Sequence, residues 1–246
     1  MIIDGHAHLG SCRAFDTTVT AEELLRTMDQ NGVDSSIVLP LPVPPDYRTA
    51  HDDIAALAGR HPGRIYGVAS LNPHVDDDEY FAEVRRCVRD LGFVGLKLHP
   101  LGHACAPTAR DATKVFETAR ALRIPLIVHT GIGAPWALPS LVIPRAQKYP
   151  DVKIVLAHAG GYVYTAEAYV AATICPNIYL ETSWCGPHRI REMAEALGPE
   201  RVMFGADLPA NVPTELTKYR TGGLSPEAQE ICLGRSARAV FGIEAI

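Results

Sequence analysis

The first eight residues, MIIDGHAH, place a short apolar run directly before two histidines, His6 and His8. Successive side chains of a strand point to opposite faces, so both imidazoles lie on one face and can reach a single ion. Asp4 has the same parity and is expected one step deeper on that face. In an open doubly wound sheet, the position after the first strand carries a glycine-rich phosphate-binding turn, and here the histidines occupy it instead. The stretch therefore favours a barrel over an open nucleotide-binding sheet.

Further along the chain, seven more apolar runs alternate with amphipathic segments of helical period. Strands that are each followed by a helix, with short turns between them, are typical of a (β/α)8 barrel. We therefore predict an α/β fold, a single (β/α)8 TIM barrel that forms one domain over residues 1–246. The predicted strands cover residues 2–4, 36–39, 65–71, 93–98, 126–128, 152–156, 178–180 and 202–204.

Local signals mark several helix ends. Thr20 is expected to cap a helix that Gly32 ends in the left-handed conformation, and Thr108 with Asp111 opens another helix, which Pro125 ends. Three acidic residues at positions 76–78 suit the positive end of a further helix dipole. Ser225, followed by proline, begins the last predicted helix. These signals support helices between the strands independently of hydrophobic periodicity.

The composition limits the classes of partner. The chain of 246 residues is 47% hydrophobic and 21% charged, with a formal net charge of -5 and no block of Lys and Arg. This balance argues against nucleic acid or an anionic membrane as a partner, and no apolar run is long enough to span a bilayer. The six cysteines are scattered without paired spacing, so we expect reduced thiols. With a strand at the first residues and no leader expected, we predict a cytoplasmic protein.

Side chains that can bind metals recur where the predicted strands end. His129, His158 and Asp207 each follow an apolar strand directly, while Lys97 and His99 share the inner face of the fourth strand. In a barrel the carboxyl ends of all strands meet at one mouth, so these residues should converge with the two N-terminal histidines. A single histidine after a strand is usually structural. Several imidazoles and a carboxylate in this order, however, are ligands suited to zinc or another divalent first-row ion.

The ordered motifs resemble the amidohydrolase superfamily over the whole chain, most closely its amidohydrolase-2 branch. These motifs are DGHAH (4–8), GLKLHP (95–100), FGAD (204–207) and CLGRSARAVFGI (232–243). The branch contains metal-dependent hydrolases and decarboxylases similar to aminocarboxymuconate semialdehyde decarboxylase. One departure is the terminal helix, where relatives usually carry Asn near Arg235 or Ser236, a difference that affects packing more than chemistry.

The resemblance implies a set of metal ligands and their roles. His6, His8, His129 and Asp207 would bind one divalent metal ion, for which we favour zinc. His158 would either be a further ligand or hydrogen-bond the activated water. The catalytic residues would be Asp207, which moves a proton, and His158, which stabilises charge on the attacked oxygen.

The substrate-binding residues centre on Lys97, for which two interpretations stay open. In some members of the superfamily, a lysine on the fourth strand is carboxylated and bridges two metals, which would add a second ion here. An unmodified lysine would instead bind a substrate carboxylate, together with His99. Arg48, Trp136 and Trp184 follow predicted strands and complete the predicted substrate-binding set.

We predict a metal-dependent hydrolase in which activated water attacks an ester, lactone or amide carbonyl of a small molecule. The alternative is a lyase, in which the same site supports non-oxidative decarboxylation of an unsaturated or aromatic acid. Decarboxylation requires a cation that holds the carboxylate beside the metal, which Lys97 or Arg48 can supply. A third interpretation is a barrel that binds a ligand without turnover, although unpaired histidines stabilise a core poorly. The short loops leave the mouth open, so contacts within a homodimer can complete it.

Overall fold

Nine strands form one curled sheet in the computed structural model, which describes residues 1–243 and so all but the last three residues of the predicted domain. The spatial order is β2-β1-β3-β4-β5-β6-β7-β8-β9, and every neighbouring pair except β1 with β2 is parallel. The strands are β1 (Ile3–Cys12), β2 (Thr17–Val19), β3 (Ser35–Pro40), β4 (Ile65–Ser70), β5 (Gly95–Leu98), β6 (Leu126–His129), β7 (Ile154–Ala157), β8 (Ile178–Glu181) and β9 (Val202–Met203).

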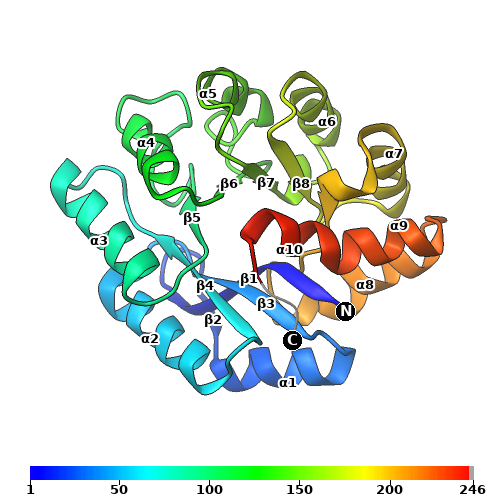
Figure 1. Cartoon of the computed structure of the whole chain (residues 1–246), viewed down its shortest axis with the longest axis horizontal. Helices are drawn as coiled ribbons and strands as arrows, with labels where there is room; N and C mark the ends of the chain where they lie inside the picture. Colours follow the sequence, from blue (N-terminus) through cyan, green and yellow to red (C-terminus); the bar gives the residue numbers. More distant parts are fainter. Residues whose placement is uncertain (244–246) are drawn as a thin grey trace.

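Backbone hydrogen bonds between the first and last parallel strands close this sheet into a barrel. The N–H of Gly5 donates to Phe204 O at 2.9 Å, and the N–H of Asp207 donates to His6 O at 2.7 Å. Ala7 and Asp207 form a parallel bridge at the same place. Helices surround the strands (Figure 1), so the predicted (β/α)8 barrel is confirmed.

The helices cover the outer face of the sheet and carry most of the predicted end signals. The Thr20 hydroxyl accepts from the N–H of Glu23 at 3.1 Å, and Gly32 ends α1 with φ +67°. Asp111 precedes α4 but makes no capping bond, because its carboxylate binds His74 instead. The α-helices are α1 (Ala21–Asn31), α2 (Tyr47–Arg60), α3 (Asp77–Arg89), α4 (Ala112–Leu122), α5 (Ile143–Lys148), α6 (Thr165–Ile174), α7 (Pro187–Leu197), α8 (Val212–Thr221), α9 (Pro226–Glu230) and α10 (Ser236–Phe241).

The C-terminal segment fills one end of the barrel. The predicted last helix is divided into α9, a π-helical turn over Ile231–Arg235 and α10, which is drawn in red across the centre of Figure 1. Val240 and Phe241 of α10 pack on the inward-facing Ile37 and Val155. This apolar packing closes the end of the barrel at which the strands begin. The opposite end, where the strands finish, is the mouth.

The first strand departs from the prediction in two ways. It is longer than expected and forms an antiparallel hairpin with β2, which the sequence analysis did not predict. Its register with β3 also shifts between Asp4 and Ala7, so side-chain parity does not carry from Asp4 to His6. The prediction that Asp4 shares a face with the histidines is therefore wrong. Its Oδ1 instead accepts from the backbone N–H groups of His6 and Ala206, each at 3.0 Å, and supports the closure of the barrel.

Across residues 1–243, no helix combines the length and the apolar character that a membrane crossing requires.

Candidate metal centre

Three of the four predicted metal ligands converge at the mouth. Ligand atoms of His6, His8 and Asp207 all lie within 4.8 Å of one another, and we call these residues the three-residue group. Both histidines come from β1, while Asp207 follows β9, and the bridge that closes the barrel brings the two strands together. Both imidazoles are buried, and 18% of the Asp207 side chain is exposed, so the group opens toward the mouth through its carboxylate.

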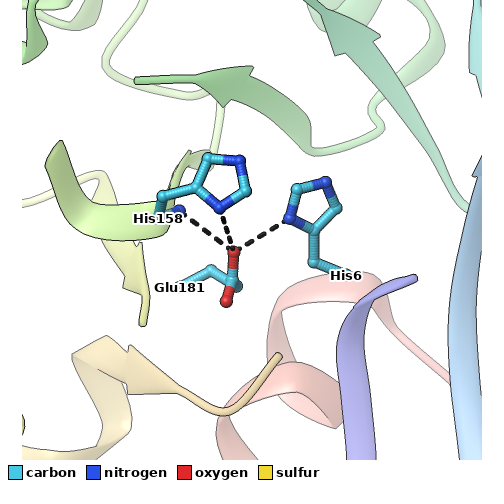
Figure 2. Close-up of side chains that lie close together, drawn as sticks. All are labelled: His6, His158 and Glu181. Atoms are coloured by element: carbon cyan, nitrogen blue, oxygen red, sulfur yellow. Dashed lines mark hydrogen bonds and ion pairs between the residues drawn. The ribbon is translucent and has the colours of Figure 1, made fainter. Parts of the chain in front are cut away.

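Glu181, at the end of β8, orients the ring of His6. Nδ1 of His6 donates to Glu181 Oε2 at 2.9 Å, and the same oxygen accepts from the backbone N–H of His158 at 3.0 Å (Figure 2). The other ring nitrogen of His6, Nε2, therefore carries a lone pair, as in the ligating histidines of metal sites. Burial, followed by the nearby Lys97, lowers the pKa of His6 well below its ordinary value. The ring is neutral at physiological pH and can ligate a cation.

His8 is oriented in the same way by the backbone of β3. Its Nδ1 donates to Pro40 O at 3.0 Å, and its Nε2 lies 3.3 Å from Asp207 Oδ1. The same oxygen is 4.0 Å from Nε2 of His6. Burial alone would raise the pKa of Asp207, but His158 and the hydrogen bond with His8 outweigh it and hold the pKa well below its ordinary value. Nε2 of His6, Nε2 of His8 and Oδ1 of Asp207 thus lie close together, and this set of imidazole and carboxylate donors fits a divalent first-row ion.

His129 and His158 face each other through their remaining ring nitrogens. Nε2 of His129 donates to Ile132 O at 2.7 Å, and Nδ1 of His158 donates to Ser183 Oγ at 2.7 Å. His129 Nδ1 and His158 Nε2 lie 3.1 Å apart, within hydrogen-bonding distance. Burial lowers the pKa of both rings, that of His158 to about 4, so protonation at neutral pH is disfavoured. His129 lies outside the three-residue group, and its role as a ligand stays a prediction.

Lys97 is buried beside the three-residue group. Its side chain projects from β5, and its Nζ lies 3.0 Å from Nε2 of His6. Burial lowers the pKa of Lys97 to about 8, although the nearby Asp207 and Glu181 act in the opposite direction. An ammonium group near its pKa can hold an anionic group of a substrate, and its neutral form can be carboxylated. Both interpretations of Lys97 therefore remain compatible with its position.

His99 lies two residues beyond Lys97 and adds a hydrogen-bond donor at the mouth. Its ring stacks on that of His129, with 4.1 Å between the centroids and 14° between the planes. Its Nδ1 accepts from the backbone N–H of Gly102 at 3.0 Å, so the neutral ring carries its proton on Nε2. Burial, followed by the neighbouring His129, lowers the pKa of His99 well below its ordinary value. His99 can therefore donate a hydrogen bond without bringing a charge.

Arg48 lies in the first turn of α2, and its Nε is 3.4 Å from Oε2 of Glu83 in α3. Its side chain is 56% exposed, and its role in substrate binding stays a prediction. Trp136 and Trp184, with 45% and 47% exposure, follow β6 and β8, in loops at the mouth.

Ligand atoms of His6, His158 and Glu181 form a second group of this kind, and a third, separate and buried, combines His51, Glu83 and Cys87; in each the atoms lie within 4.8 Å of one another. Nδ1 of His51 donates to Glu83 Oε1 at 2.9 Å, while its Nε2 accepts from the backbone N–H of Ser70 at 3.0 Å. Arg86 donates twice more to Glu83, at 3.0 and 2.8 Å. Both ring nitrogens are thus engaged, and a guanidinium already balances the carboxylate. The cluster is an ion-paired support for the end of β4.

Glu181 was not among the predicted catalytic, metal-binding or substrate-binding residues. Besides His6 and the backbone of His158, it accepts from the N–H of Ser183 at 2.5 Å and from the Ser183 hydroxyl at 3.0 Å. The sequence indicates Glu181 only indirectly, through Gly205 in the FGAD motif, which packs against the Glu181 carboxylate. A Cβ at Gly205 would lie 2.5 Å from Glu181 Oε1, so only glycine leaves room for the carboxylate.

The chain belongs to the amidohydrolase family, whose sequence model matches residues 3–243, as the resemblance of the motifs predicted. Gamma-resorcylate decarboxylase from Polaromonas sp. is 25% identical over 250 residues, which cover 75% of this chain and 76% of that enzyme. Gamma-resorcylate decarboxylase from Rhodococcus jostii is 23% identical over 250 residues, covering 79% and 75%.

Solved structures of similar proteins share the barrel. The 5-carboxyvanillate decarboxylase from Sphingomonas paucimobilis superposes with a TM-score of 0.80 at 19% identity, over 99% of both chains. The dihydroxybenzoic acid decarboxylase from Polaromonas sp., solved with bound manganese and the inhibitor 2-nitroresorcinol, has a TM-score of 0.76 at 18% identity, over 100% of this chain and 98% of that one. At this level of identity, the similarity shows the fold.

The prediction of a hydrolase is wrong in the light of these relatives. The curated relatives reported above are decarboxylases of an aromatic acid, which matches the alternative and not the main prediction. A metal held by imidazoles and a carboxylate can serve either chemistry, so the ligand pattern alone could not separate the two.

Proposed function

We propose that this chain is a metal-dependent, non-oxidative decarboxylase of an aromatic carboxylic acid. The observation that carries the proposal is the convergence of two imidazole nitrogens and a carboxylate oxygen within 4.8 Å, in a chain whose curated relatives reported above are gamma-resorcylate decarboxylases. The reaction breaks the bond between the ring and the carboxyl carbon. The electron pair of that bond stays on the ring carbon, which takes up a proton, and carbon dioxide leaves.

His6, His8 and Asp207 would hold the ion, with His129 and His158 as further candidates. When bound, a divalent ion polarises the oxygens of an acidic substrate and stabilises the charge that develops on them. Glu181 contributes by fixing the tautomer of His6, so that Nε2 is free for ligation. The lowered pKa values of His6 and Asp207 favour the neutral ring and the ionised carboxylate, which are the forms that bind metals.

Lys97 and His99 would hold the substrate beside the ion. Lys97, whose Nζ lies 3.0 Å from Nε2 of His6, would supply the positive charge that decarboxylation requires near the carboxylate, with Arg48 as a further candidate. The ring of His99 offers a neutral donor, which suits a phenolic oxygen or the second carboxylate oxygen. We propose Asp207 as the group that carries the proton to the ring carbon, because it is the part of the three-residue group exposed toward the mouth.

We propose one ion per chain, and either zinc or manganese is a candidate for it. The ligand types suit zinc, whereas the Polaromonas sp. structure contains manganese. A second ion would require a carboxylated Lys97. Metal analysis of the purified chain, with its intact mass, separates these cases, because carboxylation adds the mass of carbon dioxide to the peptide that contains Lys97.

The test of the proposed function is metal-dependent release of carbon dioxide. The chain, freed of metal, is supplied separately with zinc and manganese and offered gamma-resorcylate, 5-carboxyvanillate and unsubstituted benzoate. We expect loss of carboxylate from at least one phenolic acid only when metal is present, with a rate reduced about 100-fold or more in Asp207→Asn. Decarboxylation that persists without metal contradicts the proposal, as does turnover of an ester or lactone with none of the acids.

A further inference from the structure

Trp184 holds one oxygen of the carboxylate in the three-residue group. The indole Nε1 donates to Asp207 Oδ2 at 2.9 Å, while Asp207 Oδ1 faces Nε2 of His8 at 3.3 Å. The two oxygens therefore have separate partners on opposite sides of the carboxylate. An oxygen that accepts from an indole keeps its orientation, and its partner oxygen is left to face the imidazoles.

The backbone around this contact is held in an unfavourable conformation. Trp184 and Asp207 both have φ +68°, in the left-handed region that non-glycine residues seldom occupy. The N–H of Trp184 donates to Oε1 of the buried Glu215 at 3.0 Å, and Lys218 donates to the same oxygen at 2.6 Å. Glu215 and Lys218 belong to α8, so this helix fixes the loop that carries the indole. Strain that is maintained by neighbouring contacts in this way is typical of functional sites.

We propose that Trp184 is a positioning residue that sets the denticity of Asp207. By occupying Oδ2, the indole would leave Oδ1 as the oxygen available to an ion, beside the Nε2 atoms of His6 and His8. The inference rests on the proposed metal site and adds to it a residue whose indole binds the ligand Asp207 rather than the ion. It also changes the predicted role of Trp184 from a substrate contact to a support of the metal group.

The decisive comparison is between two tryptophan variants of the same kind. Trp184→Phe keeps an aromatic ring but removes the N–H donor, and Trp136→Phe makes the same change at the other tryptophan, whose exposure is nearly equal at 45% against 47%. Zinc affinity of the metal-free chains is measured by calorimetry, with circular dichroism to verify folding. We expect the Kd for zinc to rise about 10-fold to 100-fold in Trp184→Phe and to stay unchanged in Trp136→Phe.

A second measurement does not depend on the fold of Trp184→Phe. The chain contains two tryptophans, so in Trp136→Phe all tryptophan emission comes from Trp184. Zinc that binds at Oδ1 of Asp207 reduces the negative charge next to the indole. We expect the emission to change in parallel with zinc binding.

The outcomes separate this inference from the proposed function. If wild type binds zinc and His8→Ala does not, while Trp184→Phe binds it with wild-type affinity, the positioning role is overturned and the metal site stands. Unchanged Trp184 emission during a complete zinc titration also overturns the role. A wild-type chain that binds neither zinc nor manganese overturns the metal site, and the inference with it.

Discussion

Replacement of Glu181 by glutamine tests whether the buried carboxylate supports the metal group through its charge. Oε2 accepts from His6 Nδ1, from the N–H of His158 and from the Ser183 hydroxyl, and Oε1 accepts from the N–H of Ser183. A glutamine has the same shape but offers one NH2 group. If its oxygen serves His6 and His158, the NH2 meets the N–H of Ser183, and two donors face each other.

The expected cost follows from these contacts. A hydrogen bond to a charged group contributes about 1.5–3 kcal/mol, and a buried donor left without an acceptor costs about 1–3 kcal/mol. Because the hydroxyl of Ser183 can turn toward another acceptor, we expect the free energy of unfolding to fall by about 2–4 kcal/mol. The loss of a charged partner for His6 should also weaken zinc binding by about 10-fold to 100-fold.

Urea denaturation and zinc calorimetry on Glu181→Gln measure the two effects. Glu195→Gln is the matched control, since Glu195 is an exposed residue of α7 whose Oε1 lies 3.9 Å from Nε of Arg191. Its unfolding free energy should change by no more than about 0.5 kcal/mol. Burial raises the pKa of Glu181, against the hydrogen bonds that it accepts. If Glu181→Gln is as stable as wild type and binds zinc with the same affinity, the effect of burial on the pKa of Glu181 outweighs that of its hydrogen bonds, and Glu181 acts as a neutral acid. That result would refute this reasoning.

Three further predictions concern the substrate, the helix layer and the barrel end. Lys97→Met should raise KM for an acidic substrate about 10-fold to 100-fold, because a charge-assisted hydrogen bond is lost, and one zinc should stay bound. Steady-state kinetics measures KM, and metal analysis measures the bound zinc. An unchanged KM would exclude Lys97 as the partner of the substrate carboxylate. Burial alone would raise the pKa of Glu83, but hydrogen bonds from His51 and Arg86 lower it from 4.5 to about 2. The ionised form of Glu83 therefore stabilises the fold above pH 4.5, and the free energy of unfolding should fall by about 3 kcal/mol as the pH falls toward 2. Urea denaturation at several pH values should show this decrease in wild type and not in Glu83→Gln. Phe241→Ala should lower the free energy of unfolding by about 3–5 kcal/mol and leave the zinc affinity unchanged. Unfolding should remain one cooperative transition, as expected for a single domain, and two separate transitions would contradict the proposed single domain.

The sequence was sufficient to predict the barrel and the location of its mouth. Apolar runs followed by His129, His158 and Asp207 gave both the strands and the residues at their ends, because a barrel brings all strand ends to one side. The β1–β2 hairpin was missed because a three-residue strand, Thr17–Val19, is too short to show a periodic pattern. The position of Asp4 was missed because a register shift is a property of the pairing with β3 and leaves no mark on β1 alone.

Within the site, the residues that act through others were the hardest to predict. Arg48 follows a predicted strand, as substrate-binding residues often do, and its contact with Glu83, which is 35 residues further along the chain, could not be predicted from the sequence. No sequence motif contains Glu181, and the only indication of its position is that residue 205, which packs against it, is a glycine. The choice of decarboxylation over hydrolysis came from the relatives, since the same ligands can support both reactions.

The central claim is that His6, His8 and Asp207 hold one divalent ion. Anomalous scattering from crystals of the chain grown with zinc tests it most directly. We expect one peak per chain at about 2 Å from Nε2 of His6, Nε2 of His8 and Oδ1 of Asp207. A crystal with no peak at these atoms, or with its peak at the cluster of His51, Glu83 and Cys87, would contradict the account.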